Sequence, residues 1–231
     1  VDHMINYPIG FPKGLRYIKE TVARVVEGNP DAITMNKGIA TRCMPEFAGR
    51  IPLIIQSMAL RPNETYFADT VSVEEVLALG ADAIAVAMFV YGKEEMQYIR
   101  HLADVVRQAE AWGIPVIPHI YPLASGDEKH AVLHDPEHVF YAVRVGLEMG
   151  ADLIKVPFTG DAESFHDIVK ACPVPVVAAG GPRCASLEDA VAMTRKIAKS
   201  GAAGATMGRN VWEFSDIPHA IQTLKKAINE Q

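Results

Sequence analysis

The sequence is poor in the features that mark several specialised classes of protein. Its three cysteines, Cys43, Cys172 and Cys184, cannot form a closed set of disulfides and lack metal-ligand spacing. No apolar run is long enough to cross a bilayer, and the net charge of -6 indicates no basic surface for nucleic acid. We therefore expect a reduced, cytoplasmic protein that binds neither membranes nor nucleic acid.

What the sequence does contain is a regular alternation of two patterns. Short β-rich runs are separated by stretches with helical periodicity, and 49% of the residues are hydrophobic. The predicted strands lie at residues 1–4, 31–36, 52–58, 81–89, 115–121, 151–158, 174–181 and 202–208. The clearest predicted helices lie at residues 15–27, 94–112, 135–150 and 186–201, with Asp135 and Ser186 as caps of the last two.

The helix ends predict the topology. Gly80, Gly150 and Gly201 each close a helical pattern and stand directly before a buried run. Such short connections make successive strands parallel, and eight strands in a chain of 231 residues match the size of a (β/α)8 barrel. An open doubly wound sheet is the alternative, but no G-x-G-x-x-G follows the first predicted strand.

We therefore expect one α/β domain over residues 1–231, a single (β/α)8 TIM barrel. The chain starts at Val1 without a methionine, so we also expect a short N-terminal segment of the barrel to be missing from this sequence.

A lysine interrupts the sixth predicted strand, A-D-L-I-K-V-P-F. If Ile154 and Val156 pack under the helices, Lys155 points into the barrel near the C-terminal ends of the strands, where barrel enzymes carry their chemistry. Desolvation favours the neutral amine, which can attack a carbonyl and form a Schiff base. The alternative is a structural lysine that is paired with an acid inside the barrel.

Three further polar residues are expected at the same end of the barrel. His119 and Tyr121 share one face of the fifth predicted strand, and Asp2 lies in the first. A phenol and a carboxylate beside an imine suit proton transfer during carbon–carbon bond cleavage. The structural alternatives are a core histidine, a strand-end aromatic residue and a helix cap.

Paired glycines end the last two predicted strands. Gly180 and Gly181 belong to A-A-G-G-P-R, and Gly208 precedes Arg209 in T-M-G-R-N. Glycine lets backbone N–H groups approach an anion, and the loops after strands seven and eight of such barrels commonly bind phosphate. Arg209 would add a bidentate contact. The alternative is that these glycines serve only tight turns.

These segments resemble a known family. D-L-I-K-V-P-F-T-G-D-x-x-S-F, C-P-V-P-V-V-A-A-G-G-P-R and G-A-T-M-G-R-N-V-W are similar to archaeal-type class I fructose-bisphosphate aldolases, whose relatives include aminodideoxyheptulosonate synthases and a thiolase for a phosphorylated quorum signal. The resemblance runs over nearly all of residues 1–228 and is strongest from 150 to 215.

The resemblance implies a role for each candidate residue. It implies that Lys155 forms the Schiff base, that Tyr121 is the proton donor or acceptor, and that Asp2 is the acid of an Asp-His-Gly motif. The phosphate of dihydroxyacetone phosphate or a similar donor would bind at the glycine turns, and neither a metal nor a cofactor would be required. The binding residues under this hypothesis are Gly180, Gly181, Gly208, Arg209 and His119.

The sequence also departs from the family pattern at the sugar end of the site. Met4 replaces the usual glycine of the Asp-His-Gly motif, the loop at 5–14 is unusual, and His119 stands where aldolases of this type often carry tryptophan. The acceptor therefore stays open. A transferase such as the heptulosonate synthase and a non-catalytic phosphosugar-binding paralogue are the alternatives, and a homo-oligomer is expected.

A metal-dependent enzyme is a further alternative. His130, His134 and His138 recur every four residues. However, Asp135 and Pro136 start a new helix between the last two of them, so the three should not share one helical face.

Overall fold

The computed structural model describes residues 1–6, 12–61, 66–124 and 131–230. Its main element is a parallel sheet of seven strands in the order β1-β2-β5-β6-β7-β8-β9. The strands are β1 (Ile33–Met35), β2 (Leu53–Gln56), β5 (Ala83–Val90), β6 (Val116–Pro122), β7 (Ile154–Pro157), β8 (Val176–Ala179) and β9 (Gly204–Thr206). A separate antiparallel pair joins β3 (Met58–Ala59) to β4 (Ala68–Asp69).

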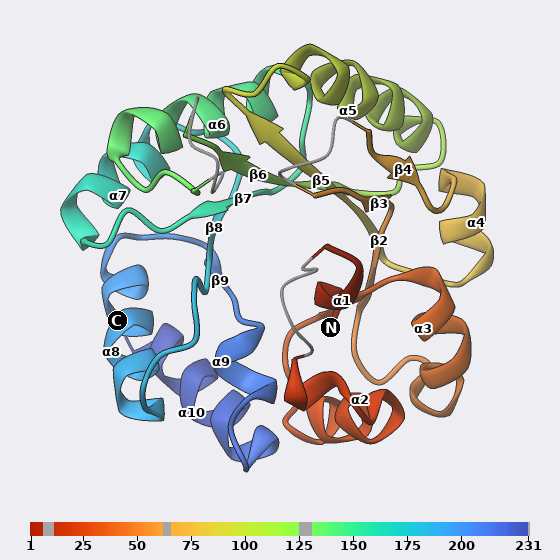
Figure 1. Cartoon of the computed structure of the whole chain (residues 1–231), viewed down its shortest axis with the longest axis vertical. Coiled ribbons are helices and arrows are strands. Elements are labelled where there is room, and N and C mark those ends of the chain that lie inside the picture. Colours follow the sequence, from red (N-terminus) through yellow and green to blue (C-terminus); the bar gives the residue numbers. More distant parts are fainter. Residues whose placement is uncertain (7–11, 62–65, 125–130, 231) are drawn as a thin grey trace.

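Two of the described helices precede β1, and helices follow the later strands of the main sheet. They are α1 (His3–Asn6), α2 (Ile18–Glu27), α3 (Lys37–Cys43), α4 (Val73–Ala78), α5 (Glu95–Glu110), α6 (Pro136–Glu148), α7 (Ala162–Lys170), α8 (Leu187–Lys199), α9 (Arg209–Trp212) and α10 (Ile217–Asn229), with short 3-10 turns at Lys13–Leu15 and Pro45–Phe47. The sheet curls through an arc, with α4 to α8 on its outer side and the N-terminus inside the arc (Figure 1).

The predicted helix ends are confirmed. The Asp135 side chain accepts a hydrogen bond from the His138 backbone N–H at the start of α6, and Ser186 forms a capping box with Asp189 at the start of α8. Gly80, Gly150 and Gly201 have φ values of 67°, 88° and 77°. These are left-handed conformations that glycine adopts without steric cost.

The alternation predicted for β7 is also confirmed. Ile154 and Val156 are fully buried, whereas Lys155 lies partly exposed on the opposite face. Ile154 packs directly on α6, because a Cβ added at Gly146 would lie 3.0 Å from Ile154 Cδ1. Lys155 therefore faces the inside of the arc, away from the helices.

The first predicted strand is wrong. Residues 3–6 form the short helix α1. The two preceding residues contact the sheet through hydrogen bonds from the Val1 ammonium to the Thr34 carbonyl at 2.6 Å and from Gln56 Nε2 to the Asp2 carboxylate at 3.4 Å. Four alternating residues carry too little pattern to specify a strand. The other seven predicted strands are confirmed, so the described chain is a curled seven-stranded sheet, without an eighth strand that closes the ring.

None of the described helices is both long and apolar enough to span a membrane. Cys43, Cys172 and Cys184 are free thiols.

Candidate active site

The inside of the arc brings together residues from distant parts of the chain. Lys155 on β7 is the register partner of His119 on β6 and of Val177 on β8. His119 is buried, with 4% of its surface exposed. Burial lowers the pKa of His119 well below its usual value, and the positive charge of Lys155 lowers that pKa further. The imidazole is therefore neutral beside the lysine.

Asp2 also lies close enough to Lys155 and His119 to interact with both electrostatically, although the strand predicted for Asp2 does not form. Its Oδ1 accepts a hydrogen bond from His3 Nδ1 at 3.1 Å, and its Oδ2 accepts one from Gln56 Nε2 at 3.4 Å. Burial raises the pKa of Asp2, but the His3 hydrogen bond and the nearby positive charges of Val1 and Lys155 outweigh this effect. The pKa of Asp2 is held well below its usual value, so Asp2 is a carboxylate.

Tyr121 completes the interior group. It shares a face of β6 with His119, and its ring centroid is 6.5 Å from that of Phe89 on β5. Burial raises the pKa of the Tyr121 phenol far above its usual value; Asp2 contributes to this rise and Arg209 opposes it. The phenol is therefore protonated at neutral pH, and it lies within the electrostatic influence of both the Asp2 and the Arg209 side chains.

The glycine turns after β8 and β9 contact each other, and the Gly180 N–H is used in this contact. The Gly180 N–H donates to the Thr206 carbonyl at 2.9 Å, and a Cβ at this position would lie 2.5 Å from Met207 Sδ. Gly180 thus allows β8 and the end of β9 to pack closely, and its N–H is already used. Gly181 has a φ of +61°, which glycine adopts readily.

Gly208 and Arg209 join these turns to the N-terminal residues. A Cβ at Gly208 would lie 2.6 Å from the Trp212 ring and 2.9 Å from the His3 ring. The Arg209 guanidinium donates to the Gly181 carbonyl at 3.0 Å, so it is held across the two turns. The structure therefore brings all four predicted phosphate-binding residues to one end of the arc.

The sequence analysis did not identify Asn210, a residue of α9 whose side chain hydrogen-bonds to the turn after β8. Its Nδ2 donates to the Gly180 carbonyl at 2.8 Å and to the Pro182 carbonyl at 3.0 Å, and its Oδ1 accepts from the Cys184 N–H at 2.7 Å. Asn210 is 1% exposed. The only hint in the sequence is a polar side chain between Arg209 and the apolar Val211–Trp212 pair. This hint does not reveal the hydrogen-bond partners of Asn210, because they lie in the turn after β8.

We expect Asn210→Ala to lower the free energy of unfolding by roughly 2–3 kcal/mol, because it leaves buried groups of the β8 turn without hydrogen bonds. Urea denaturation measures this change. Asn229→Ala is the matched control, since Asn229 makes one hydrogen bond on the surface of α10; it should change stability by about 0.5 kcal/mol or less. Equal losses of unfolding free energy in the two variants would contradict the role of Asn210 in holding the β8 turn.

The histidines of the metal alternative do not converge. His134 lies before α6, with its Nδ1 2.9 Å from the Phe158 carbonyl, whereas His138 lies inside α6 and pairs with Asp135. His130 lies outside the described residues, as do residues 7–11 of the unusual loop after Asp2. Within the described chain, no three metal-binding side chains form a group.

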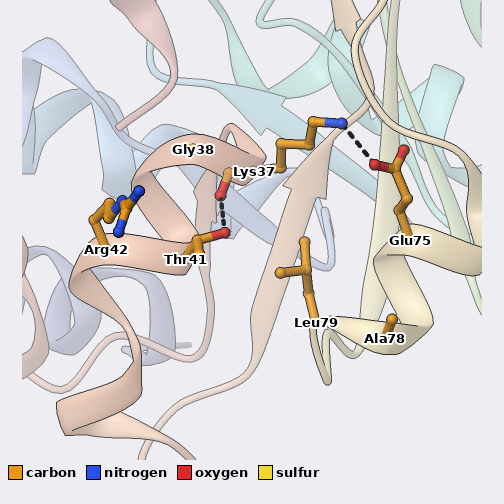
Figure 2. A pocket seen from close by; sticks show the side chains of 7 residues that line it. All are labelled: Lys37, Gly38, Thr41, Arg42, Glu75, Ala78 and Leu79. Atoms are coloured by element: carbon orange, nitrogen blue, oxygen red, sulfur yellow. Dashed lines mark hydrogen bonds and ion pairs between the residues drawn. The ribbon is translucent and has the colours of Figure 1, made fainter.

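A hollow of about 430 Å³ lies elsewhere, between α3 and α4. Figure 2 shows that the Lys37 ammonium and the Glu75 carboxylate face each other across it, 2.7 Å apart. The remaining lining residues are Gly38, Thr41, Arg42, Ala78 and Leu79. None of the predicted site residues lines this hollow, and both charged partners are about half exposed. We therefore place the candidate site inside the arc.

Comparison with known proteins finds relatives that match most of the chain. The chain is 34% identical to a 2-amino-3,7-dideoxy-D-threo-hept-6-ulosonate synthase from Halobacterium salinarum, over 99% of this chain and 84% of that protein. It is 33% identical to a class 1 fructose-bisphosphate aldolase from Thermoproteus tenax, over 86% of this chain and 74% of that protein.

Solved structures show the same likeness. An archaeal fructose-1,6-bisphosphate aldolase, whose catalytic lysine is covalently bound to the carbinolamine intermediate of its substrate, superposes with a TM-score of 0.87 and 27% identity, over 99% of this chain and 91% of that one. The sequence profile of the DeoC/LacD family aldolases matches residues 1–214. The chain therefore belongs to the DeoC/LacD aldolase family, whose members make and break carbon–carbon bonds.

Proposed function

We propose that this protein is a class I aldolase that forms an imine between Lys155 and a phosphorylated ketose or ketone. The observation that carries the proposal is the inward-facing Lys155, which is flanked by a neutral His119 in a member of an aldolase family. The related archaeal aldolase whose catalytic lysine carries a carbinolamine supports the same chemistry.

The proposed reaction needs no metal or redox step. Once Lys155 has given up its proton, its amine attacks the ketone carbon, and the carbinolamine loses water to give an iminium ion. The iminium then accepts the electron pair of the adjacent carbon–carbon bond as that bond breaks, which releases an aldehyde and leaves an enamine. Protonation of the enamine and hydrolysis of the imine return the amine and release the three-carbon ketone.

Tyr121 and Asp2 are proposed to move protons in this sequence. In cleavage the Tyr121 phenol would take the proton of the substrate hydroxyl while it passes its own proton through water to the Asp2 carboxylate, and in condensation these transfers would run in reverse. Their electrostatic coupling across the interior supports the pairing. Asp2 interacts electrostatically with Lys155, and Tyr121 follows His119, the register partner of Lys155, on the same face of β6.

The phosphate is proposed to bind between Gly181, Gly208 and Arg209. The hydrogen bond from Arg209 to the Gly181 carbonyl holds the guanidinium at these turns, and a guanidinium is well suited to bind a phosphate. Gly180 would act by close packing, because its N–H is already bonded to Thr206. Dihydroxyacetone phosphate is the donor that this arrangement and the aldolase relatives favour.

A transferase is the second candidate. The 34% identity to a heptulosonate synthase over 99% of the chain favours it as strongly as the aldolase relatives favour cleavage. Both reactions would begin with the same imine on Lys155. Product analysis with candidate acceptor aldehydes separates them, since cleavage of fructose 1,6-bisphosphate is expected of the aldolase alone.

The direct test is borohydride reduction after incubation with dihydroxyacetone phosphate, followed by peptide mass spectrometry. We expect a reduced three-carbon phosphate adduct on the peptide that contains Lys155. An adduct on another lysine would overturn the proposal. Binding of the phosphate ester with neither an adduct nor turnover would instead indicate the non-catalytic phosphosugar-binding paralogue.

We also propose that the barrel closes between β9 and β1 through the N-terminal segment. The hydrogen bond from Val1 to β1 supports this closure, as does the edge-on contact of His3 with Trp212, whose ring centroids are 4.9 Å apart. A single domain over the whole chain, a homo-oligomer and a cytoplasmic location stay predictions from the sequence. Size-exclusion chromatography with light scattering tests the oligomer.

A further inference from the structure

Gln56 is a polar side chain buried deep in the interior that the proposed mechanism does not use. It ends β2 and is 1% exposed. Within the described chain, its Oε1 is buried without a hydrogen-bond partner. An unpaired buried acceptor costs about 1–3 kcal/mol, so its presence beside Asp2 and His119 calls for an explanation by function.

Gln56 reaches His119 across an intervening strand. β5 lies between β2 and β6, and its residues facing the two side chains are Ala85, the register partner of Gln56, and Ala87, the register partner of His119. A larger side chain at either position would stand between the amide and the imidazole. The two alanines let Gln56 Nε2 approach His119 Nδ1 to 3.3 Å.

Asp2 fixes the orientation of the Gln56 amide. The Asp2 carboxylate can only accept hydrogen bonds, so the amide nitrogen, rather than Oε1, must face it at 3.4 Å. The same nitrogen faces His119 Nδ1, which must therefore act as an acceptor. A neutral imidazole whose Nδ1 accepts carries its proton on Nε2. The chain Asp2–Gln56–His119 thus selects one of the two tautomers.

The strand order indicates which part of a bound substrate would lie next to the His119 Nε2–H group. β7 lies between β6 and β8, and the proposed phosphate turns follow β8 and β9. A ketone held as an imine on Lys155, with its phosphate arm toward those turns, directs its other arm toward β6. In a three-carbon ketone phosphate that arm carries the free hydroxyl group. His119, the β6 partner of Lys155, is on this side.

We propose that His119 donates a hydrogen bond from Nε2 to the free hydroxyl of the ketone phosphate, and that Gln56 is the positioning residue that fixes the required tautomer. The substrate in this inference rests on the proposed function, whereas the tautomer of His119 does not depend on it. The Oε1 of Gln56 is an acceptor at the same end of the site, which matches a hydroxylated rather than an apolar arm. The site would thereby select α-hydroxyketone phosphates over simple ketone phosphates.

The first test measures the tautomer without substrate. Long-range ¹H–¹⁵N correlation spectra of the labelled protein report which ring nitrogen carries the proton, and the His119 signals are assigned by their loss in His119→Gln. We expect an unprotonated Nδ1 and a protonated Nε2, and in Gln56→Leu a shift toward a mixture of the two tautomers. A protonated Nδ1 in the unmodified protein would overturn the inference even if the enzyme is an aldolase.

The second test compares dihydroxyacetone phosphate with hydroxyacetone phosphate, which lacks the free hydroxyl. The readout is the concentration of each that gives half-maximal borohydride adduct on Lys155. We expect the unmodified protein to prefer dihydroxyacetone phosphate by about tenfold, the scale of one buried hydrogen bond. The preference should be lost in His119→Asn and reduced in Gln56→Leu. It should survive in His119→Gln, whose amide nitrogen can occupy the position of Nε2.

The variants keep the two proposals distinguishable. His166→Gln, an exposed histidine on α7, is the matched control and should keep the full preference. Adducts of equal strength with both ketones in the unmodified protein, or a preference that survives His119→Asn, would overturn the hydroxyl contact while leaving the aldolase proposal intact. No adduct with either ketone would overturn the aldolase proposal and, with it, the hydroxyl contact; the tautomer would still be decided by the spectra.

Discussion

Replacing Lys155 with methionine should abolish the borohydride adduct and lower kcat by roughly 10⁵-fold, the scale of loss when an enzyme's nucleophile is removed. Methionine is similar to lysine in length and apolar bulk but lacks the amine, so the loss would report chemistry rather than packing. Steady-state kinetics with fructose 1,6-bisphosphate and mass spectrometry of the trapped protein measure the two effects. Urea denaturation should show that the variant remains folded.

Lys155→Arg separates the two interpretations of this lysine. Asp2 is a carboxylate whose pKa is lowered in part by the Lys155 charge, so a structural ion pair is the competing explanation. Arginine keeps the positive charge and can pair with Asp2, but it is protonated in proteins and cannot form an imine. We expect Lys155→Arg to be as inactive as Lys155→Met. Activity close to normal in Lys155→Arg would mean that the lysine serves only as a charge.

Lys170→Met is the matched control for these variants. Lys170 ends α7, the helix that follows β7, and its side chain is exposed. The same substitution there should leave kcat, KM and the adduct unchanged. A comparable loss of activity in Lys170→Met would show that removing a lysine from this segment acts through folding, and it would remove the support that Lys155→Met gives to imine chemistry.

Removing the Tyr121 hydroxyl should have the second-largest effect. We expect Tyr121→Phe to lower kcat for cleavage by about 10²–10⁴-fold, the usual contribution of a general acid or base, with KM changed only a few-fold. Burial raises the phenol pKa far above its usual value, so the hydroxyl group is protonated in the resting site. In condensation it donates this proton directly, and in cleavage it takes the substrate proton while it passes its own through water to the Asp2 carboxylate.

The trapped adduct shows which step has failed in Tyr121→Phe. Imine formation needs the Lys155 amine, whereas bond cleavage needs proton transfer from the substrate hydroxyl. The variant should therefore still give a borohydride adduct with dihydroxyacetone phosphate although it turns over slowly. Loss of the adduct together with activity would assign Tyr121 to imine formation instead. Tyr17→Phe is the control, because Tyr17 stands before α2 and is 69% exposed, so this variant should behave like the unmodified protein.

The sequence by itself determined the features that depend on neighbours along the chain. The caps of α6 and α8, the glycines that end the helices, seven strands and the inward side of β7 all follow from patterns a few residues long. Lys155 could be singled out in this way because strand alternation is a local rule and a charge in an otherwise apolar strand violates it.

The tertiary structure decided the features that depend on contacts between distant segments. Residues 1–3 are held by contacts with β1 and α9 and form no strand, the Gly180 N–H is taken by Thr206, and Asn210 fastens the β8 turn. In the sequence, Gln56 is simply one polar residue of an apolar strand. Its approach to His119 depends on two alanines of a third strand. Hydrogen bonds between residues tens of positions apart leave no periodic trace in the sequence, because only the folded sheet brings their partners together.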